Sequence, residues 1–195
     1  MADFIPQQGD LSFLRAKKTG RYYGPYMTGG TVTTQSVAAA NSLRAFPFFV
    51  PKTAKFDRIA LRVATAGTGT TPKVRLGIYE DLNDGTLYPG ALVLDAGEVN
   101  VNSTGLKEIT IDVTLKGGKL YWLVMLGQDT TSMVVAAIPA ADSIATFLGF
   151  DNGLTGTPYL GYAVTQTYGA LPATCPTGSP TDWSLNVPLI ALRKA

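Results

Sequence analysis

The sequence has no histidine, one cysteine and a charged fraction of only 15% in 195 residues. Without histidine, Ser-His-Asp triads, Cys-His catalysis and His-ligated zinc are excluded. Cys175 has no second cysteine with which to form an internal disulfide, so the fold must hold without one, as in proteins of reducing compartments. We expect Cys175 to be an inert thiol, because no basic neighbour in the sequence lowers its pKa.

Charge and hydropathy exclude two classes of partner. The 16 basic and 14 acidic residues leave a net charge of +2, which provides no general attraction to nucleic acid or to an anionic membrane. Apolar runs such as 120–126 are far shorter than the roughly 20 residues that span a bilayer, and the first residues lack the features of a signal peptide. We therefore expect a chain that folds in a cytoplasm, with no nucleic-acid or membrane partner.

The sequence does contain many short β-type segments separated by turn signals. Ile59, Leu61 and Val63 alternate with polar or small residues, and 120–127 is continuously apolar, as in a strand covered on both faces. Gly117-Gly118 is typical of a tight hairpin turn. The pattern predicts an all-β fold, an antiparallel β-sandwich or jelly roll of about ten strands with an extended N-terminal arm. The predicted strands are 31–34, 43–50, 56–65, 74–79, 99–101, 108–114, 120–127, 133–138, 159–166 and 187–192.

Residues 1–25 differ from the rest and are interpreted as an arm, followed by one domain over 26–195. The arm combines large apolar residues with basic ones, which suits a segment that becomes ordered on a partner; a frayed terminus with one helical turn is the open alternative. Its candidate docking residues are Phe4, Ile5, Leu11, Phe13, Leu14, Arg15, Lys17, Lys18 and Arg21. The Ser/Thr/Gly-rich stretch 165–181 is predicted to be a long loop, either functional or disordered.

Two patterns in the sequence are similar to sites of known chemistry but lack a residue or a geometry that the chemistry requires. The run 81–85, Asp-Leu-Asn-Asp-Gly, is similar to a calcium loop, but position twelve is Leu92 rather than a carboxylate. Glu80 and Asp81 are adjacent on a predicted strand, so their side chains point to opposite faces, which is poor geometry for paired acid–base catalysis. We therefore expect no enzyme, no metal site and no cofactor.

Aromatic residues near the long loop are candidate contacts for a surface receptor. Tyr side chains set among Ser, Thr, Gly and Asn are typical of adaptable binding surfaces, and aromatic faces also bind saccharides. The candidates are Tyr159, Tyr162, Tyr168 and Trp183. Packing in the core remains the alternative for the tyrosines. Arg58, Arg62, Lys73 and Arg75 are interpreted as part of a solvated sheet face rather than a nucleic-acid site.

Several motifs in order carry a resemblance to a known family. They are Gly-Arg-Tyr-Tyr-Gly-Pro at 20–25, Ala-Asn-Ser-Leu-Arg-Ala-Phe-Pro-Phe-Phe-Val-Pro at 40–51, Phe-Asp-Arg-Ile at 56–59, Arg-Leu-Gly-Ile-Tyr-Glu-Asp at 75–81, Pro-Gly at 89–90 followed by Val-Leu-Asp-Ala-Gly at 93–97, and Gly-Lys-Leu-Tyr-Trp-Leu at 118–123. Over roughly residues 20–126 the order resembles a β-sandwich module of structural proteins of tailed bacteriophages, of the head-decoration, head-fibre or tail-fibre type. The motifs mark turns and core positions, so the resemblance implies a fold and a virion location and assigns no functional residue.

Three functional hypotheses follow, of which the first two come from the resemblance and the third does not depend on it. The first is a homotrimeric capsid decoration or cement protein, made in the host bacterial cytoplasm, whose arm binds the major capsid protein and stabilises the head shell. The second is a tail-tip or tail-fibre protein that binds a saccharide of the host surface. The third is a cellular carbohydrate-binding module or small enzyme.

Overall fold

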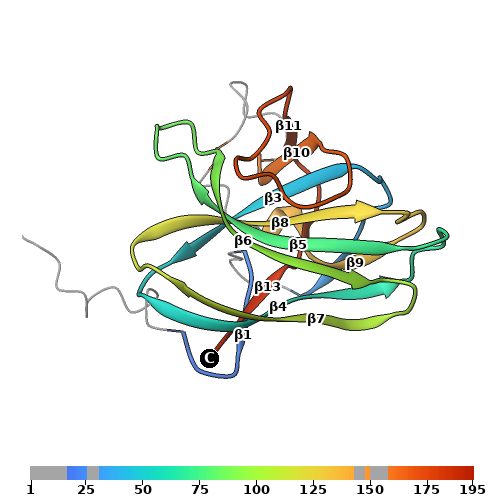
Figure 1. Ribbon diagram of the computed structural model, residues 1–195, viewed down its shortest axis with the longest axis horizontal. Coiled ribbons are helices and arrows are strands. Elements are labelled where there is room, and N and C mark those ends of the chain that lie inside the picture. Colours follow the sequence, from blue (N-terminus) through green and yellow to red (C-terminus); the bar gives the residue numbers. More distant parts are fainter. Residues whose placement is uncertain (1–16, 26–30, 143–147, 150–157) are drawn as a thin grey trace, which may run out of the picture.

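The computed structural model describes residues 17–25, 31–142, 148–149 and 158–195. These residues form two antiparallel β-sheets packed face to face (Figure 1), one of seven strands and one of six. The all-β sandwich predicted from the alternating segments is therefore confirmed. Among the residues described, no helix is long and apolar enough to cross a membrane.

The seven-stranded sheet is built around its longest strand, β4. One edge of β4 pairs with β7, and the other pairs with β13 near the start of β4 and with β9 near its end. A bulge between Phe56 and Arg58 shifts the alternation, so that Phe56 and Ile59 both face the core. The strands are β1 (Tyr22–Tyr23), β2 (Thr33–Ser36), β4 (Ala54–Thr65), β7 (Gly105–Leu115), β9 (Val134–Ile138), β12 (Val187–Pro188) and β13 (Ala191–Lys194).

The six-stranded sheet has the order β11-β10-β3-β8-β5-β6. Its strands are β3 (Ser42–Val50), β5 (Lys73–Asp81), β6 (Pro89–Asn100), β8 (Lys119–Gln128), β10 (Gly161–Thr165) and β11 (Thr181–Trp183). β8 lies between β3 and β5, and its residues 121–127 are buried, which confirms the prediction of a strand covered on both faces. Gly118 adopts a φ of 75° in the turn before β8, as the Gly117-Gly118 pair predicts.

The main core lies between the two sheets. It contains Phe46, Phe48, Phe56 and Tyr121, and the ring of Trp183 meets Phe46 edge-on with centroids 5.7 Å apart. Arg44 is also buried, 4% exposed, with its guanidinium 5.5 Å from the centre of the Trp183 ring. The two sheets pack against each other through these aromatic residues, and Phe46, Phe48, Phe56 and Tyr121 are among the largest fully buried side chains.

A second apolar cluster covers the opposite face of the six-stranded sheet. It includes Tyr79, Trp122, Leu171 and Cys175. Residues 166–180, here termed the strap, lie over this face: the hydroxyls of Tyr79 and Tyr88 donate to the carbonyls of Pro172 and Pro176, at 2.8 and 2.6 Å. The long loop predicted at 165–181 therefore completes a core on the outer face of the sheet.

The structure corrects the predicted boundary between arm and domain. β1 pairs with β13, with Tyr22 opposite Arg193, and the Gly20 amide donates to the Lys194 carbonyl at 2.8 Å. Residues 17–25 are thus part of the sandwich, and a boundary at residue 25 is wrong. This short edge strand is held by backbone pairing and leaves little hydrophobic pattern in the sequence, so local periodicity does not predict it.

Two strand predictions also need correction, and one strand has no counterpart among the predicted ones. The predicted strand 187–192 is two short strands, because the Ile190 amide donates to the Pro188 carbonyl at 2.9 Å in a tight turn, after which the chain leaves β9 and pairs with β4. β6 begins at Pro89 rather than at 99, since Gly90 and Gly97 obscure its alternation. β11 (Thr181–Trp183) was not predicted, because it is short and lies within a polar stretch.

Candidate functional site

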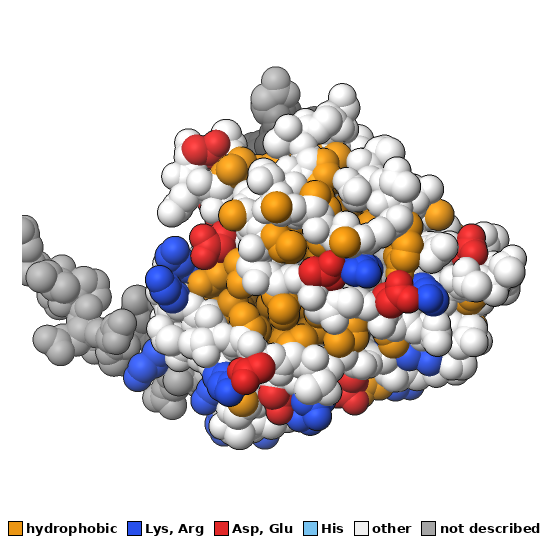
Figure 2. Space-filling model, in the orientation of Figure 1, with side chains coloured by type: hydrophobic (Ala, Val, Ile, Leu, Met, Phe, Trp, Pro, Cys, Tyr) orange, Lys and Arg blue, Asp and Glu red, His pale blue; other side chains and the backbone are white. Residues whose placement is uncertain are grey.

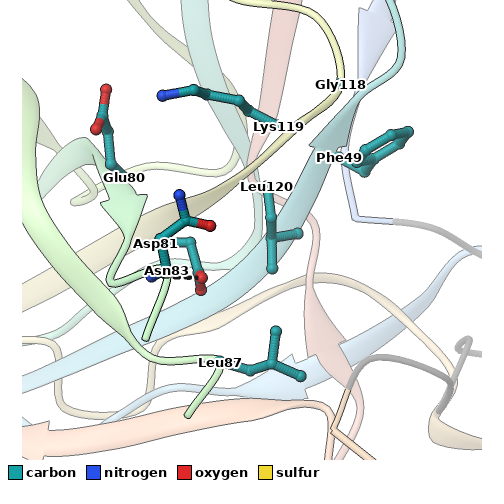
Figure 3. A pocket seen from close by; sticks show the side chains of 8 residues that line it. All are labelled: Phe49, Glu80, Asp81, Asn83, Leu87, Gly118, Lys119 and Leu120. Atoms are coloured by element: carbon teal, nitrogen blue, oxygen red, sulfur yellow. Dashed lines mark hydrogen bonds between the residues drawn. The ribbon is translucent and has the colours of Figure 1, made fainter. Parts of the chain in front are cut away.

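A surface pocket of about 510 Å³ lies where β5 ends and β8 begins (Figure 3). It is built from the end of β3, the end of β5 and the loop that follows it, and the start of β8. The pairing of β3 and β5 with β8 brings these segments together. The lining residues are Phe49, Glu80, Asp81, Asn83, Leu87, Gly118, Lys119 and Leu120.

Asp81 is the fixed polar group of the pocket. Its Oδ1 accepts a hydrogen bond from Trp122 Nε1 at 2.9 Å, and its Oδ2 accepts one from the Asn83 amide at 3.0 Å. Trp122 belongs to the buried cluster beneath the strap, so the carboxylate is hydrogen-bonded to a fully buried side chain. A carboxylate has about four acceptor positions, so Asp81 retains capacity for a ligand.

The loop between β5 and β6 holds an unusual conformation next to this carboxylate. Asn83 and Leu87 have φ values of 62° and 51°, a region that a bulky residue such as leucine rarely adopts. The Leu82 amide donates to the Tyr88 carbonyl at 2.8 Å, and Thr86 Oγ1 donates to Asp84 Oδ1 at 2.6 Å. These bonds and the packing of Leu87 maintain the strained backbone, so the pocket wall is preformed.

The remaining lining combines charges with an apolar surface. In Figure 3 the Glu80 and Lys119 side chains extend to the same side, whereas the Leu120 side chain points the other way, toward Leu87. Neither charge forms an ion pair within the part of the chain that the structure describes. The pocket contains no Ser or Cys nucleophile, and the described residues include no group of three or more His, Cys, Asp or Glu that could hold a metal. The lining therefore combines two carboxylates and one ammonium with an apolar surface.

The structure places only part of the predicted arm. Phe4, Ile5, Leu11, Phe13, Leu14 and Arg15 lie outside the described residues. Lys17 packs on the sandwich, with its ammonium 4.4 Å from the centre of the Tyr23 ring and 4.9 Å from that of Phe48, and burial lowers its pKa to about 8. Lys18 and Arg21 are exposed and remain available to a partner.

The four predicted receptor contacts are not brought together. Trp183 is 9% exposed and packs in the main core, so its prediction as a surface contact is wrong. Tyr162 packs against Tyr88 and Trp122, with ring centroids 4.9 and 5.6 Å apart. Tyr168 donates to Glu98 Oε2 at 2.8 Å. Tyr159 is half-buried, and none of the four lines the pocket.

The run 81–85 is the part of the sequence that signals the pocket. It is similar to a calcium loop, but in the structure Asp81 and Asn83 form a wall of the pocket with Leu87. Nothing in the sequence around Phe49 or Lys119 indicates that they line a pocket, because only the pairing of β3 and β5 with β8 brings them near residue 81. The basic residues Arg58 and Arg62 lie on β4, and Lys73 and Arg75 lie on β5 in the other sheet, so the four do not form one stripe.

Comparison with protein-family models and with curated proteins gives no match to the chain. The structural features that bear on function are an N-terminal segment that forms an edge strand of the sandwich and a pocket at the end of one sheet.

Proposed function

We propose that the chain is a structural protein of a tailed-bacteriophage virion, a homotrimeric capsid decoration protein that binds the major capsid protein. The resemblance of residues 20–126 supports this proposal. The observation that carries it is the anchoring of residues 17–25 to the sandwich through β1 and Lys17. The apolar and basic residues before Lys17 thus start from a fixed point on the domain, as an attachment segment requires.

An apolar seam along one side of the sandwich supports contact between copies. β6 and β7 are the edge strands of their sheets there, and Val93, Ala96, Ile109 and Val113 are only partly buried between them. Figure 2 shows hydrophobic side chains gathered over this region, with charged side chains around them. An apolar area with a polar rim is the composition of a subunit interface, so we place the contacts of the trimer on this seam.

The test is the location of the chain on intact particles. Immunogold labelling is expected to spread over the head, and a variant lacking residues 1–16 is expected to fold but not to bind capsids. Binding to the shell would lower the free energy of the assembled head, so loss of the chain should reduce the thermal stability of the particles. Label at the tail, or particles that bind the shortened variant equally well, would contradict the proposal.

A second candidate function is receptor binding by a tail-tip or tail-fibre protein, and the pocket at the end of β5 favours it. This candidate predicts that the variant lacking residues 1–16 still binds bacterial cells, because the pocket is made by the sandwich alone. A decoration protein should lose its binding in the same experiment. A cellular carbohydrate-binding module would bind saccharide and label no particle.

A further inference from the structure

The charges around the pocket narrow the class of ligand. Glu80 and Asp81 leave β5 toward opposite faces of the sheet, as their adjacency predicts, yet both border the pocket, because it lies at the end of the strand. With Lys119, the lining therefore has two carboxylates and one ammonium. The excess of negative charge opposes phosphate, sulfate or a carboxylate ligand. The charged rim also disfavours a purely apolar ligand, whose binding would remove water from these groups without replacing their hydrogen bonds.

A hydroxyl-rich ligand matches the mixture of donors and acceptors in the lining. Each hydroxyl both donates and accepts, so it can donate to Asp81 or Glu80 and accept from Lys119. The side-chain amide of Asn83 can do both. Hydrogen bonds to charged groups are the stronger ones, which suits several hydroxyls on one small ligand.

The apolar part of the lining fits one face of a sugar ring. Leu87, Leu120 and Phe49 form this part of the pocket, between and beside the polar side chains. A pyranose has C–H groups over its faces and hydroxyls around its edge, so it can cover leucine and aromatic surface while its hydroxyls reach the rim. The volume of about 510 Å³ lies within the range of small-molecule sites.

The pocket is also prepared for binding before a ligand arrives. Trp122 Nε1 and the Asn83 backbone amide hold the Asp81 carboxylate, and the packing of Leu87 against the second cluster supports its positive φ. A preformed site avoids the entropic cost of ordering a loop on binding.

We propose that this pocket binds a neutral hexopyranose, as one ring of a larger saccharide. The proposal deepens the second candidate function, receptor binding, and rests on it for its biological role. It is independent of the position of the chain on a particle, because the lining comes only from β3, β5, β8 and the loop after β5.

The test is NMR titration of the isotope-labelled full chain with glucose, galactose, mannose and N-acetylglucosamine, with inorganic phosphate as the anionic probe. At least one hexose is expected to shift the amide signals of Asn83, Lys119 and Leu120 saturably, with a Kd in the millimolar range. Phosphate is expected to produce no saturable shift there. Absence of saturable shifts with every hexose, or saturable binding of phosphate alone, would overturn the proposal.

Two variants assign the binding to the pocket. Asn83→Gly removes the side-chain amide while glycine tolerates the φ of 62°, and Glu80→Gln removes a charge without changing the shape. Each is expected to weaken hexose binding about tenfold, as expected for the loss of a strong hydrogen bond. The matched control is Asn102→Gly, at an exposed position in the turn between β6 and β7, and its affinity should be unchanged. Equal affinity in all three variants would overturn the assignment.

Failure of this proposal differs from failure of the proposed function. A chain that labels heads but binds no hexose leaves the decoration role intact. A chain that binds hexose in the pocket and labels tails instead supports the receptor-binding role.

Discussion

Arg44 is a buried cation in the main core. Its guanidinium stacks over Trp183, one nitrogen donates to the Val37 carbonyl at 3.5 Å, and Nε has no hydrogen-bond partner. Within the described part of the chain no carboxylate pairs with it, and burial lowers its pKa to about 10. The desolvation of this charge therefore opposes folding, and the stacking offsets it only in part.

Replacing Arg44 with a neutral side chain of similar length is expected to keep or raise stability. Arg44→Met should leave the free energy of unfolding unchanged or increase it by about 1–2 kcal/mol, because it removes an unpaired buried charge. Urea denaturation measures the effect, with Arg62→Met at an exposed position of β4 as the control. A loss of about 3 kcal/mol would show that the charge of Arg44 is compensated in the folded state.

Gly77 lies where the strap touches the outer face of the six-stranded sheet. A Cβ atom there would come within 2.2 Å of Leu171 Cδ1 and 2.7 Å of the Leu94 carbonyl oxygen. Leu171 can rotate away, but the carbonyl belongs to the β6 backbone and cannot move without disturbing the sheet. Glycine is required at this position for close packing rather than for an unusual φ.

We predict that Gly77→Ala lowers the free energy of unfolding by about 1–3 kcal/mol, the usual cost of overpacking. Gly169→Ala is the matched control within the strap, because a Cβ there meets no atom within 4 Å. Chemical denaturation of both variants provides the comparison. Equal free energies of unfolding for the two variants would show that the strap and β6 can shift to admit the Cβ atom without loss of stability.

At the scale of elements, the strap is fixed to the sheet mainly by hydrogen bonds to β6 and to tyrosine hydroxyls. The Leu92 amide donates to the Ala173 carbonyl and the Cys175 amide to the Gly90 carbonyl, both at 2.9 Å. Leu171 N donates to Asp95 Oδ2 at 3.0 Å. These bonds bury Cys175, 2% exposed, and burial raises the pKa of its thiol to about 11. The thiol is therefore both covered and protonated at neutral pH, as the sequence predicts for an inert cysteine.

The reactivity of Cys175 should report opening of the strap. Tyr79→Phe combined with Tyr88→Phe removes the two hydroxyl bonds to Pro172 and Pro176, each worth about 1 kcal/mol. We expect alkylation of Cys175 in the native protein to accelerate by about tenfold or more, as local opening becomes easier. Tyr22→Phe, on the other sheet, is the control. Unchanged alkylation in the double variant would show that apolar packing alone holds the strap.

At the scale of the whole molecule, residues near the two ends of the chain meet on one sheet. β1 pairs with β13, and Arg193 on β13 forms two hydrogen bonds with Asp57, at 2.9 and 2.7 Å. Tyr22 on β1 donates to Glu108 on β7. The segment that we propose as an attachment arm therefore leaves from a part of the sandwich that is held by three strands.

Truncations should separate the arm from the fold. Removal of residues 1–16 leaves β1 and Lys17 in place, and we expect a free energy of unfolding within about 0.5 kcal/mol of the full chain. Removal of residues 1–25 also deletes β1 and the partly buried Tyr23, at an expected cost of about 2 kcal/mol. Thermal and urea denaturation measure both. A shortened chain starting at residue 26 with full stability would show that β1 contributes nothing to the fold.

The sequence by itself determined the class of fold and the central strands. Ile59, Leu61 and Val63 face the core as their alternation predicts, and the run at 121–127 is buried on both faces. These predictions succeed because side chains alternate along a strand, so burial appears directly in the local pattern. The absence of histidine likewise excluded whole classes of chemistry without a structure.

Only the tertiary structure decided where segments distant in the sequence meet. β1 is recognisable only by its partner β13, the strap only by the sheet that it covers, and the pocket only by the pairing of β3 and β5 with β8. Trp183 is a further example. It lies in a polar stretch of sequence, and nothing in that stretch indicates that the residue packs against Phe46. Local periodicity reports how a strand is covered, whereas strand pairing and loop packing depend on contacts between residues far apart in the chain.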